Sequence, residues 1–217
     1  FDSNPEQLAR AEQRIADSLA LLESSGNLTA DQVATANQHL RRTGDLADAV
    51  AGVDLVIEAV FENLDLKQAV FRELDALAPA TAIFASNTSS YMPSSLAFVT
   101  TRPDRVIVTH YFNPAHLLPL VEIVPGPETS TATIDAIRQL YTAINKSPVV
   151  LQREILGFVG NRLQTALLRE ALALIEDGIA TPEEIDTIIR TGFGRRLALA
   201  GIFEVREYSP LQTQFSS

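Results

Sequence analysis

Residues 105–124, RVIVTHYFNPAHLLPLVEIV, hold two apolar runs on either side of a polar loop. Both runs have the length and the β-branched content of strands, and we predict strands at 105–110 and 120–124. His110 ends the first run, and Glu122 lies inside the second, twelve positions later. A buried carboxylate must be paired, and a His–Glu pair can transfer protons. On spacing alone, a structural glutamate held by an amide or an arginine is about equally plausible.

Strands alternate with helical patterns over the first two thirds of the chain. Further apolar runs predict strands at 53–60, 82–85 and 149–152, the first of them covered on both faces. Helix starts with a capping residue occur at Asn4 and Thr29, and apolar spacing predicts helices around 66–77 and 134–144. This alternation predicts an α/β fold, a Rossmann-type, doubly wound and mostly parallel sheet.

The pattern changes after residue 154, and only helical spacing follows. Thr181 opens a capping box, and Gly192 is the expected stop of that helix. We therefore predict a first domain at 1–154 and a small all-helical C-terminal domain at 155–217. The helical pattern stops soon after Tyr208, and the tail from Leu211 to Ser217 shows no pattern.

Composition excludes several classes of function. The net charge is −10 and no basic cluster is present, which argues against a nucleic-acid partner. No apolar run approaches the roughly 18 residues that cross a bilayer, so we expect no membrane span. The absence of cysteine excludes thiolate chemistry and suits a cytoplasmic setting. The three histidines lack metal-ligand spacing, so we expect no metal site.

Polar residues lie where a doubly wound sheet would bind a ligand. Ser86–Ser90, SNTSS, follows a predicted strand, although an ordinary polar turn is the simpler interpretation in isolation. Asp2 lies where a ribose-binding acid would end a strand, or is a solvated turn residue; the glycine fingerprint expected about 20 residues earlier is missing from this chain. Asn161, in the motif GFVGNR, either caps a helix or points into a cleft.

Taken in order, Asp2, the Glu62/Asn63/Lys67 group, SNTSS, HYFNP, VEIV and GFVGNR resemble the 3-hydroxyacyl-CoA dehydrogenase superfamily from Asp2 to about Glu204. The resemblance implies an NAD-dependent oxidation of the 3-hydroxyl of an L-3-hydroxyacyl-CoA or a short 3-hydroxy acid. It implies four catalytic roles: His110 as general acid/base, Glu122 as its orienting partner, Ser89 on the substrate oxygen, and Asn161 holding the substrate. It also implies an NAD site lined by Asp2, Ala59, Glu62, Lys67, Asn87 and Asn113.

Within the superfamily, the motifs PLVE at 119–122 and GRR at 194–196 are similar to the lambda-crystallin and L-gulonate 3-dehydrogenase branch. Fatty-acyl members usually carry a lysine in the segment that here reads Leu117–Pro119. A free 3-hydroxy acid could use Arg195 or Arg196 as a carboxylate fork, although a surface arginine pair is the simpler interpretation. The resemblance implies a homodimer through the helical domain. The competing interpretation is a catalytically silent, crystallin-like or truncated structural protein on the same scaffold.

Overall fold

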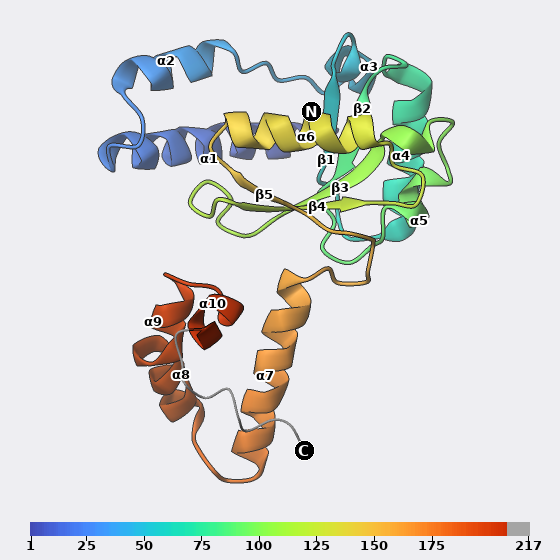
Figure 1. Ribbon diagram of the computed structural model, residues 1–217. Helices are drawn as coiled ribbons and strands as arrows, with labels where there is room; N and C mark the ends of the chain where they lie inside the picture. The colour runs from blue at the N-terminus through green and yellow to red at the C-terminus, as the bar shows by residue number, and fades with distance from the viewer. Residues whose placement is uncertain (208–217) are drawn as a thin grey trace. The chain divides into compact units, whose positions relative to one another are not determined.

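The first part of the protein, Phe1–Phe158, is built on one five-stranded sheet (Figure 1). The computed structural model describes residues 1–207. The strands lie in the order β1 to β5, and every neighbouring pair is parallel except β3 with β4. They are β1 Leu55–Glu58, β2 Ile83–Ser86, β3 Val106–Tyr111, β4 Leu120–Pro125 and β5 Ser147–Val150. The predicted α/β fold with a mostly parallel sheet is confirmed.

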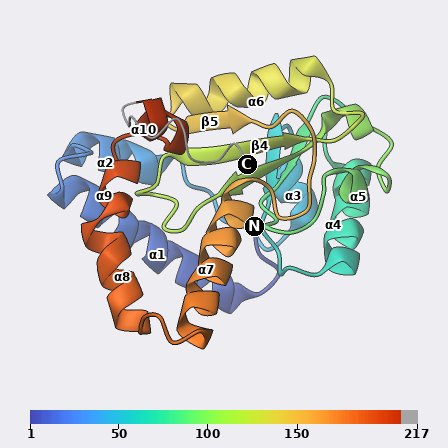
Figure 2. The same cartoon turned by 60° about the horizontal axis from the view of Figure 1, so that its bottom comes forward.

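Helices cover both faces of this sheet, as Figures 1 and 2 show for α6 on one face and for α3, α4 and α5 on the other. Successive strand residues point to opposite faces. Phe84 therefore packs with α4 while Ala85 packs with α6. The helices of this part are α1 Pro5–Ser24, α2 Ala30–Gln38, α3 Leu46–Val50, α4 Leu64–Leu77, α5 Ser94–Ala97 and α6 Thr131–Ala143, with a 3-10 turn at Pro103–Arg105.

Strand β1 differs from its prediction, because it is shorter than 53–60 and is not covered on both faces. It pairs only with β2 in the described sheet and so lies at its edge. Val56 packs on the α4 side, but Ile57 is 46% exposed. Helix α6 packs mainly on β4 and β5, which lie at the other edge of the sheet from β1, so it leaves Ile57 of β1 uncovered. An apolar run therefore did not guarantee two covered faces.

The second part, from Val159 onward, is helical throughout the residues that the structure describes. Its helices are α7 Gly160–Glu176, α8 Pro182–Thr191, α9 Phe193–Leu197 and α10 Ile202–Glu207. The predicted capping box at Thr181 is confirmed, and Gly192 caps the end of α8 as expected. The expectations for Tyr208 and for the tail 211–217 lie outside the described residues. Within residues 1–207, no helix is both long and apolar enough to cross a membrane.

One ionic cluster fastens the end of α4 to the segment before β3. The carboxylate of Asp75 accepts hydrogen bonds from the backbone N–H of Thr101 and from Nε of Arg102, both at 2.7 Å. The Arg102 guanidinium also lies 5.1 Å from the ring centre of Phe84 in the core. Burial alone would raise the pKa of Asp75, but the hydrogen bonds from Thr101 and the charge of Arg102 outweigh it and hold that pKa below its ordinary 3.8.

We expect Asp75→Asn to lower the free energy of unfolding at pH 7 by about 1–3 kcal/mol, because charge-assisted hydrogen bonds are lost. A depressed carboxyl pKa stabilises the fold fully above the unfolded value of 3.8, and this stabilisation is lost as pH falls through the folded value. The difference between variant and wild type should therefore shrink below about pH 4. Urea unfolding across pH measures it. Asp135→Asn, which breaks the exposed pair with Arg138, is the control and should change little. A loss of unfolding free energy in Asp75→Asn that does not vary with pH would contradict this account of Asp75.

Candidate active site

A buried histidine–glutamate pair lies across strands β3 and β4. The antiparallel register sets His110 directly opposite Glu122, which places both side chains on the same face of the sheet. Nδ1 of His110 lies 2.9 Å from Oε2 of Glu122, and the two side chains are only 5% and 4% exposed. Of the two interpretations that spacing left open, the structure shows the histidine as partner of the carboxylate.

The other nitrogen of the same ring faces Ser89. Nε2 of His110 lies 3.2 Å from the hydroxyl oxygen of Ser89, which comes from the loop after β2. The rings of Phe112 and Phe158 pack on the imidazole, with ring centres at 4.9 and 5.3 Å. Three of the four predicted catalytic residues are thus brought together, and the imidazole plane is fixed by two hydrogen-bonding partners and two aromatic neighbours.

This arrangement selects one form of the imidazole. A carboxylate accepts hydrogen bonds only, so the Glu122 oxygen favours the tautomer with a proton on Nδ1. Nε2 of His110 is then left with its lone pair, directed to the Ser89 hydroxyl. A neutral imidazole held in this way can take a proton at Nε2, and Glu122 offsets the positive charge that results. The chemistry available here is proton transfer to or from a hydroxyl group.

The carboxyl ends of the parallel strands β1, β2 and β3 meet at one edge of the sheet, next to Ser89. Ala59, Asn87 and Asn113, which were predicted to line an NAD site, follow those three strands in turn. Asn87, which follows β2, links the ends of β1 and β3. Its backbone N–H donates to the Glu58 carbonyl at 2.8 Å, and its side-chain oxygen accepts from the Tyr111 N–H at 3.2 Å. Ligands of doubly wound sheets bind at this edge.

Lys67 lies behind this edge and is only 1% exposed. Its ammonium is 2.9 Å from Oε1 of Glu58 and 3.3 Å from Oε2 of Glu62. It also donates to the Val60 carbonyl oxygen at 3.2 Å. The structure therefore commits the Lys67 charge to two carboxylates of the protein itself, whereas Glu62 is 39% exposed and can be reached from the edge.

Sequence reasoning missed Glu58 and Ser86 as members of this network. Glu58 is buried, and its Oε2 accepts a hydrogen bond of 2.5 Å from the Ser86 hydroxyl. A signal was present, because Glu58 follows an apolar strand segment just as Glu122 sits within one. The requirement for a partner that was applied to Glu122 applies equally to Glu58.

Asp2 does not end a strand in this structure, contrary to the prediction. The residues at the amino end have no strand geometry, and the Asp2 carboxylate accepts a hydrogen bond of 2.8 Å from the backbone N–H of Asn4. Asn4 in turn caps α1, as predicted. A strand needs a neighbouring strand for its backbone hydrogen bonds. In the described sheet β1 is the edge strand, and the residues around Asp2 do not pair with it.

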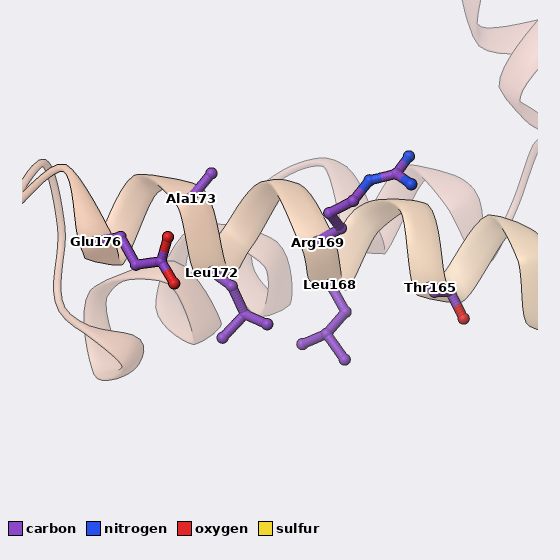
Figure 3. A pocket seen from close by; sticks show the side chains of 6 residues that line it. All are labelled: Thr165, Leu168, Arg169, Leu172, Ala173 and Glu176. Atoms are coloured by element: carbon purple, nitrogen blue, oxygen red, sulfur yellow. The ribbon is translucent and has the colours of Figure 1, made fainter.

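Asn161 lies in the second part of the chain, on the first turn of α7. The N-cap residue of α7 is Val159, so the alternative that Asn161 caps this helix is wrong. The same helix carries a hollow of about 460 Å³ lined by Thr165, Leu168, Arg169, Leu172, Ala173 and Glu176. Figure 3 shows Leu168 and Leu172 projecting together from one side of the helix. None of the predicted catalytic residues lines this hollow.

A tyrosine pair lies on the other face of the sheet from His110, because successive strand residues point to opposite faces. The hydroxyls of Tyr111 and Tyr141 bond to each other, and their rings pack edge to face at 5.7 Å. Burial, followed by the hydrogen bond with Tyr141, raises the pKa of Tyr111 well above its ordinary value of 10. Tyr111 therefore neighbours His110 in sequence, but its side chain belongs to the core under α6. Within residues 1–207, no cluster of three side chains suited to a metal ion occurs.

Two family models match almost the whole chain. The NAD binding domain of 3-hydroxyacyl-CoA dehydrogenase matches residues 1–155, and the C-terminal domain of 3-hydroxyacyl-CoA dehydrogenase matches residues 157–214.

Individual proteins show the same similarity. The L-carnitine dehydrogenase of Mesorhizobium japonicum is 49% identical over 161 residues, which are 74% of this chain and 44% of that protein. Lambda-crystallin of Oryctolagus cuniculus is 39% identical over 205 residues, which are 94% of this chain and 64% of that protein. The structure of 3-hydroxybutyryl-CoA dehydrogenase from Escherichia coli K12 superposes with a TM-score of 0.83 at 34% identity, over 89% of this chain and 40% of that one. The chain thus spans 44–64% of the length of these two curated relatives.

Proposed function

This chain belongs to the 3-hydroxyacyl-CoA dehydrogenase family, and we propose that its protein oxidises the 3-hydroxyl of a short 3-hydroxy acid, or of its CoA thioester, with NAD as the oxidant. One observation carries the proposal. His110 is held between the Glu122 carboxylate and the Ser89 hydroxyl, and Nε2, the nitrogen that can accept a proton, faces that hydroxyl. That geometry matches the proton half of an alcohol oxidation.

In the proposed reaction, Ser89 holds the substrate oxygen by a hydrogen bond and keeps it within reach of His110. Nε2 of His110 takes the hydroxyl proton as the carbonyl forms. Glu122 keeps the other ring nitrogen protonated and stabilises the imidazolium. Bound NAD would accept the hydride from C3, the carbon that bears this hydroxyl. In the reverse direction, His110 returns the proton to the new alcohol.

The residues at the sheet edge fit NAD. Ala59 and Asn113 are exposed and Asn87 is half-buried, so these side chains can touch a ligand at the carboxyl ends of three parallel strands. Asp2 would supply an acceptor for a ribose hydroxyl and Glu62 would line the NAD site, as the resemblance to the family implies. Lys67, fully buried, would contribute through Glu58 and Glu62 and not by direct contact.

A free short 3-hydroxy acid is our preferred substrate class. L-carnitine, which names several relatives including the one at 49% identity, is itself a 3-hydroxy acid with a free carboxylate. The segment Leu117–Pro119 lacks the lysine expected of fatty-acyl enzymes. Arg195 and Arg196 lie in the last turn of helix α9, and either guanidinium could bind a carboxylate.

The direct test offers the full-length protein L-carnitine, L-3-hydroxybutyrate, L-gulonate and 3-hydroxybutyryl-CoA in parallel, with NAD. We expect NADH formation, read as absorbance at 340 nm, with one of the free acids and a kcat/KM at least tenfold above that of the thioester. Preference for the thioester would overturn the free-acid assignment. No turnover of any compound would favour the catalytically silent, crystallin-like alternative.

Replacing the proposed base separates proton transfer from cofactor binding. We expect His110→Gln to lower kcat by about 10²–10⁴-fold, because the general base is lost, while the Kd for NAD changes little. Steady-state turnover and NADH fluorescence titration measure the two quantities. His39→Gln is the matched control, since His39 is an exposed residue at the end of α2. Near-native turnover in His110→Gln would refute the assigned role.

We also propose that two copies of the protein associate through the helical part. Helix α7 has no buried residue among those described, and it exposes leucines along its length. They are Leu163, Leu167, Leu168 and Leu172. Apolar surface of this kind is typical of an interface between subunits.

Light scattering after gel filtration tests this association. We expect the wild type to have the mass of a dimer, and Leu168→Glu/Leu172→Glu to have half that mass, because two buried carboxylates would oppose the contact. Leu140→Glu places the same charge on an exposed leucine of α6 and should leave the dimer intact. A monomeric wild type would rule the proposal out.

A further inference from the structure

A single carboxylate holds the loop that presents Ser89 to the histidine. Oε1 of Glu62 accepts three hydrogen bonds from this loop: from the Thr88 hydroxyl at 2.5 Å, the Ser89 N–H at 3.1 Å and the Ser90 N–H at 3.0 Å. The Thr88 hydroxyl oxygen in turn accepts from the N–H groups of Ser90 and Tyr91. The backbone on both sides of the Ser89 side chain is therefore tied to Glu62.

The second oxygen of Glu62 is held from behind by Lys67. The ammonium lies 3.3 Å from Oε2 of Glu62 and is itself anchored to Glu58 at 2.9 Å. Glu58 is fixed by the Val60 N–H at 2.6 Å and by the Ser86 hydroxyl. A continuous set of polar contacts therefore runs from the buried ion pair, through Glu62, to the Ser89 loop.

We propose that Glu62 is a positioning residue, which sets the Ser89 hydroxyl on Nε2 of His110 by holding the backbone of residues 88–90, with Lys67 as its anchor. The inference rests on the proposed function only where it predicts an effect on turnover. The hydroxyl of a serine is one bond beyond Cβ, so a fixed backbone leaves only rotation about χ1 to place it. Without the carboxylate, the Thr88 hydroxyl and the Ser89 N–H lose this acceptor, and the Ser90 N–H keeps only the Thr88 hydroxyl oxygen. The 3.2 Å contact between Ser89 and His110 then loses its support.

The charge state of Glu62 agrees with this role. Burial alone would raise its pKa, but the Thr88 hydrogen bond and the Lys67 charge outweigh burial and hold the pKa below its ordinary 4.5. The carboxylate is therefore ionised at neutral pH and accepts all three hydrogen bonds.

The test reads the His110 ring directly in the NAD-free, full-length protein. The chain has three histidines, so a long-range proton–nitrogen spectrum of ¹⁵N-labelled protein resolves His110 with His39 and His116 as internal references. Ser89→Ala should move the Nε2 resonance of His110, because its hydrogen bond is lost. We expect Glu62→Ala to move it in the same direction, and the double variant to match Ser89→Ala alone.

Conservative variants separate positioning from general support of the fold. Glu62→Gln keeps an oxygen that can accept from the loop and should restore Nε2 towards the wild-type position. Glu62→Asp withdraws the acceptor by one methylene and should move Nε2 as Glu62→Ala does. If Glu62→Ala does not fold, Glu62→Asp tests the positioning role in its place. Glu73→Ala, an exposed glutamate of α4, is the matched control and should leave Nε2 in place.

Turnover supplies an independent measure. We expect Glu62→Ala to lower kcat at least tenfold, and to add less than twofold to the loss caused by Ser89→Ala. An unmoved Nε2 in Glu62→Ala, or additive effects in the double variant, would overturn the inference. A weaker NAD affinity with an unmoved Nε2 would make Glu62 a cofactor ligand only, which also overturns it. Failure of the proposed function shows instead as a wild type without turnover, and the nitrogen spectrum still decides the role of Glu62.

Discussion

The antiparallel pairing of β3 with β4 is the constraint on which the rest of the site depends. A parallel neighbour would need a long crossover, whereas the reversal of the chain brings Glu122 opposite His110 after a short loop. Because side chains alternate along a strand, a slip of one residue would turn the carboxylate to the other face of the sheet. The core on both faces, with Ile107 on one and Val106 on the other, fixes the register and therefore fixes the pair.

Much of the fold could be predicted, because its signals are local. The caps at Asn4, Thr29 and Thr181 were readable as short motifs, and apolar runs located the five strands to within a few residues. The short helices α3 and α5 were missed, since four or five residues are too few to show a helical period. Strand β5 begins at Ser147, earlier than predicted, because Pro148 is tolerated in a strand that, among residues 1–207, pairs on one side only.

The sequence predicted most of the individual residues of the candidate site, but not the hydrogen bonds that link them. His110 and Glu122 stood out because each lies in or next to an apolar strand, and Ser89 stood out through its motif. The link through Glu62 and Lys67 could not be predicted, because it joins the start of α4 and the residues before it to a loop about 26 residues away through one side-chain carboxylate. Hydrogen bonds between side chains of distant elements leave no periodic trace in a sequence.

The hairpin also bears on the order in which the site comes together. Contacts close in sequence form at little entropic cost, so the twelve-residue separation of His110 and Glu122 lets the pair form as soon as the hairpin closes. Ser89 must wait for the crossover that brings β2 beside β3, and Glu62 must wait for α4. An incompletely folded chain would then contain the His110–Glu122 pair without the Ser89 hydroxyl beside it.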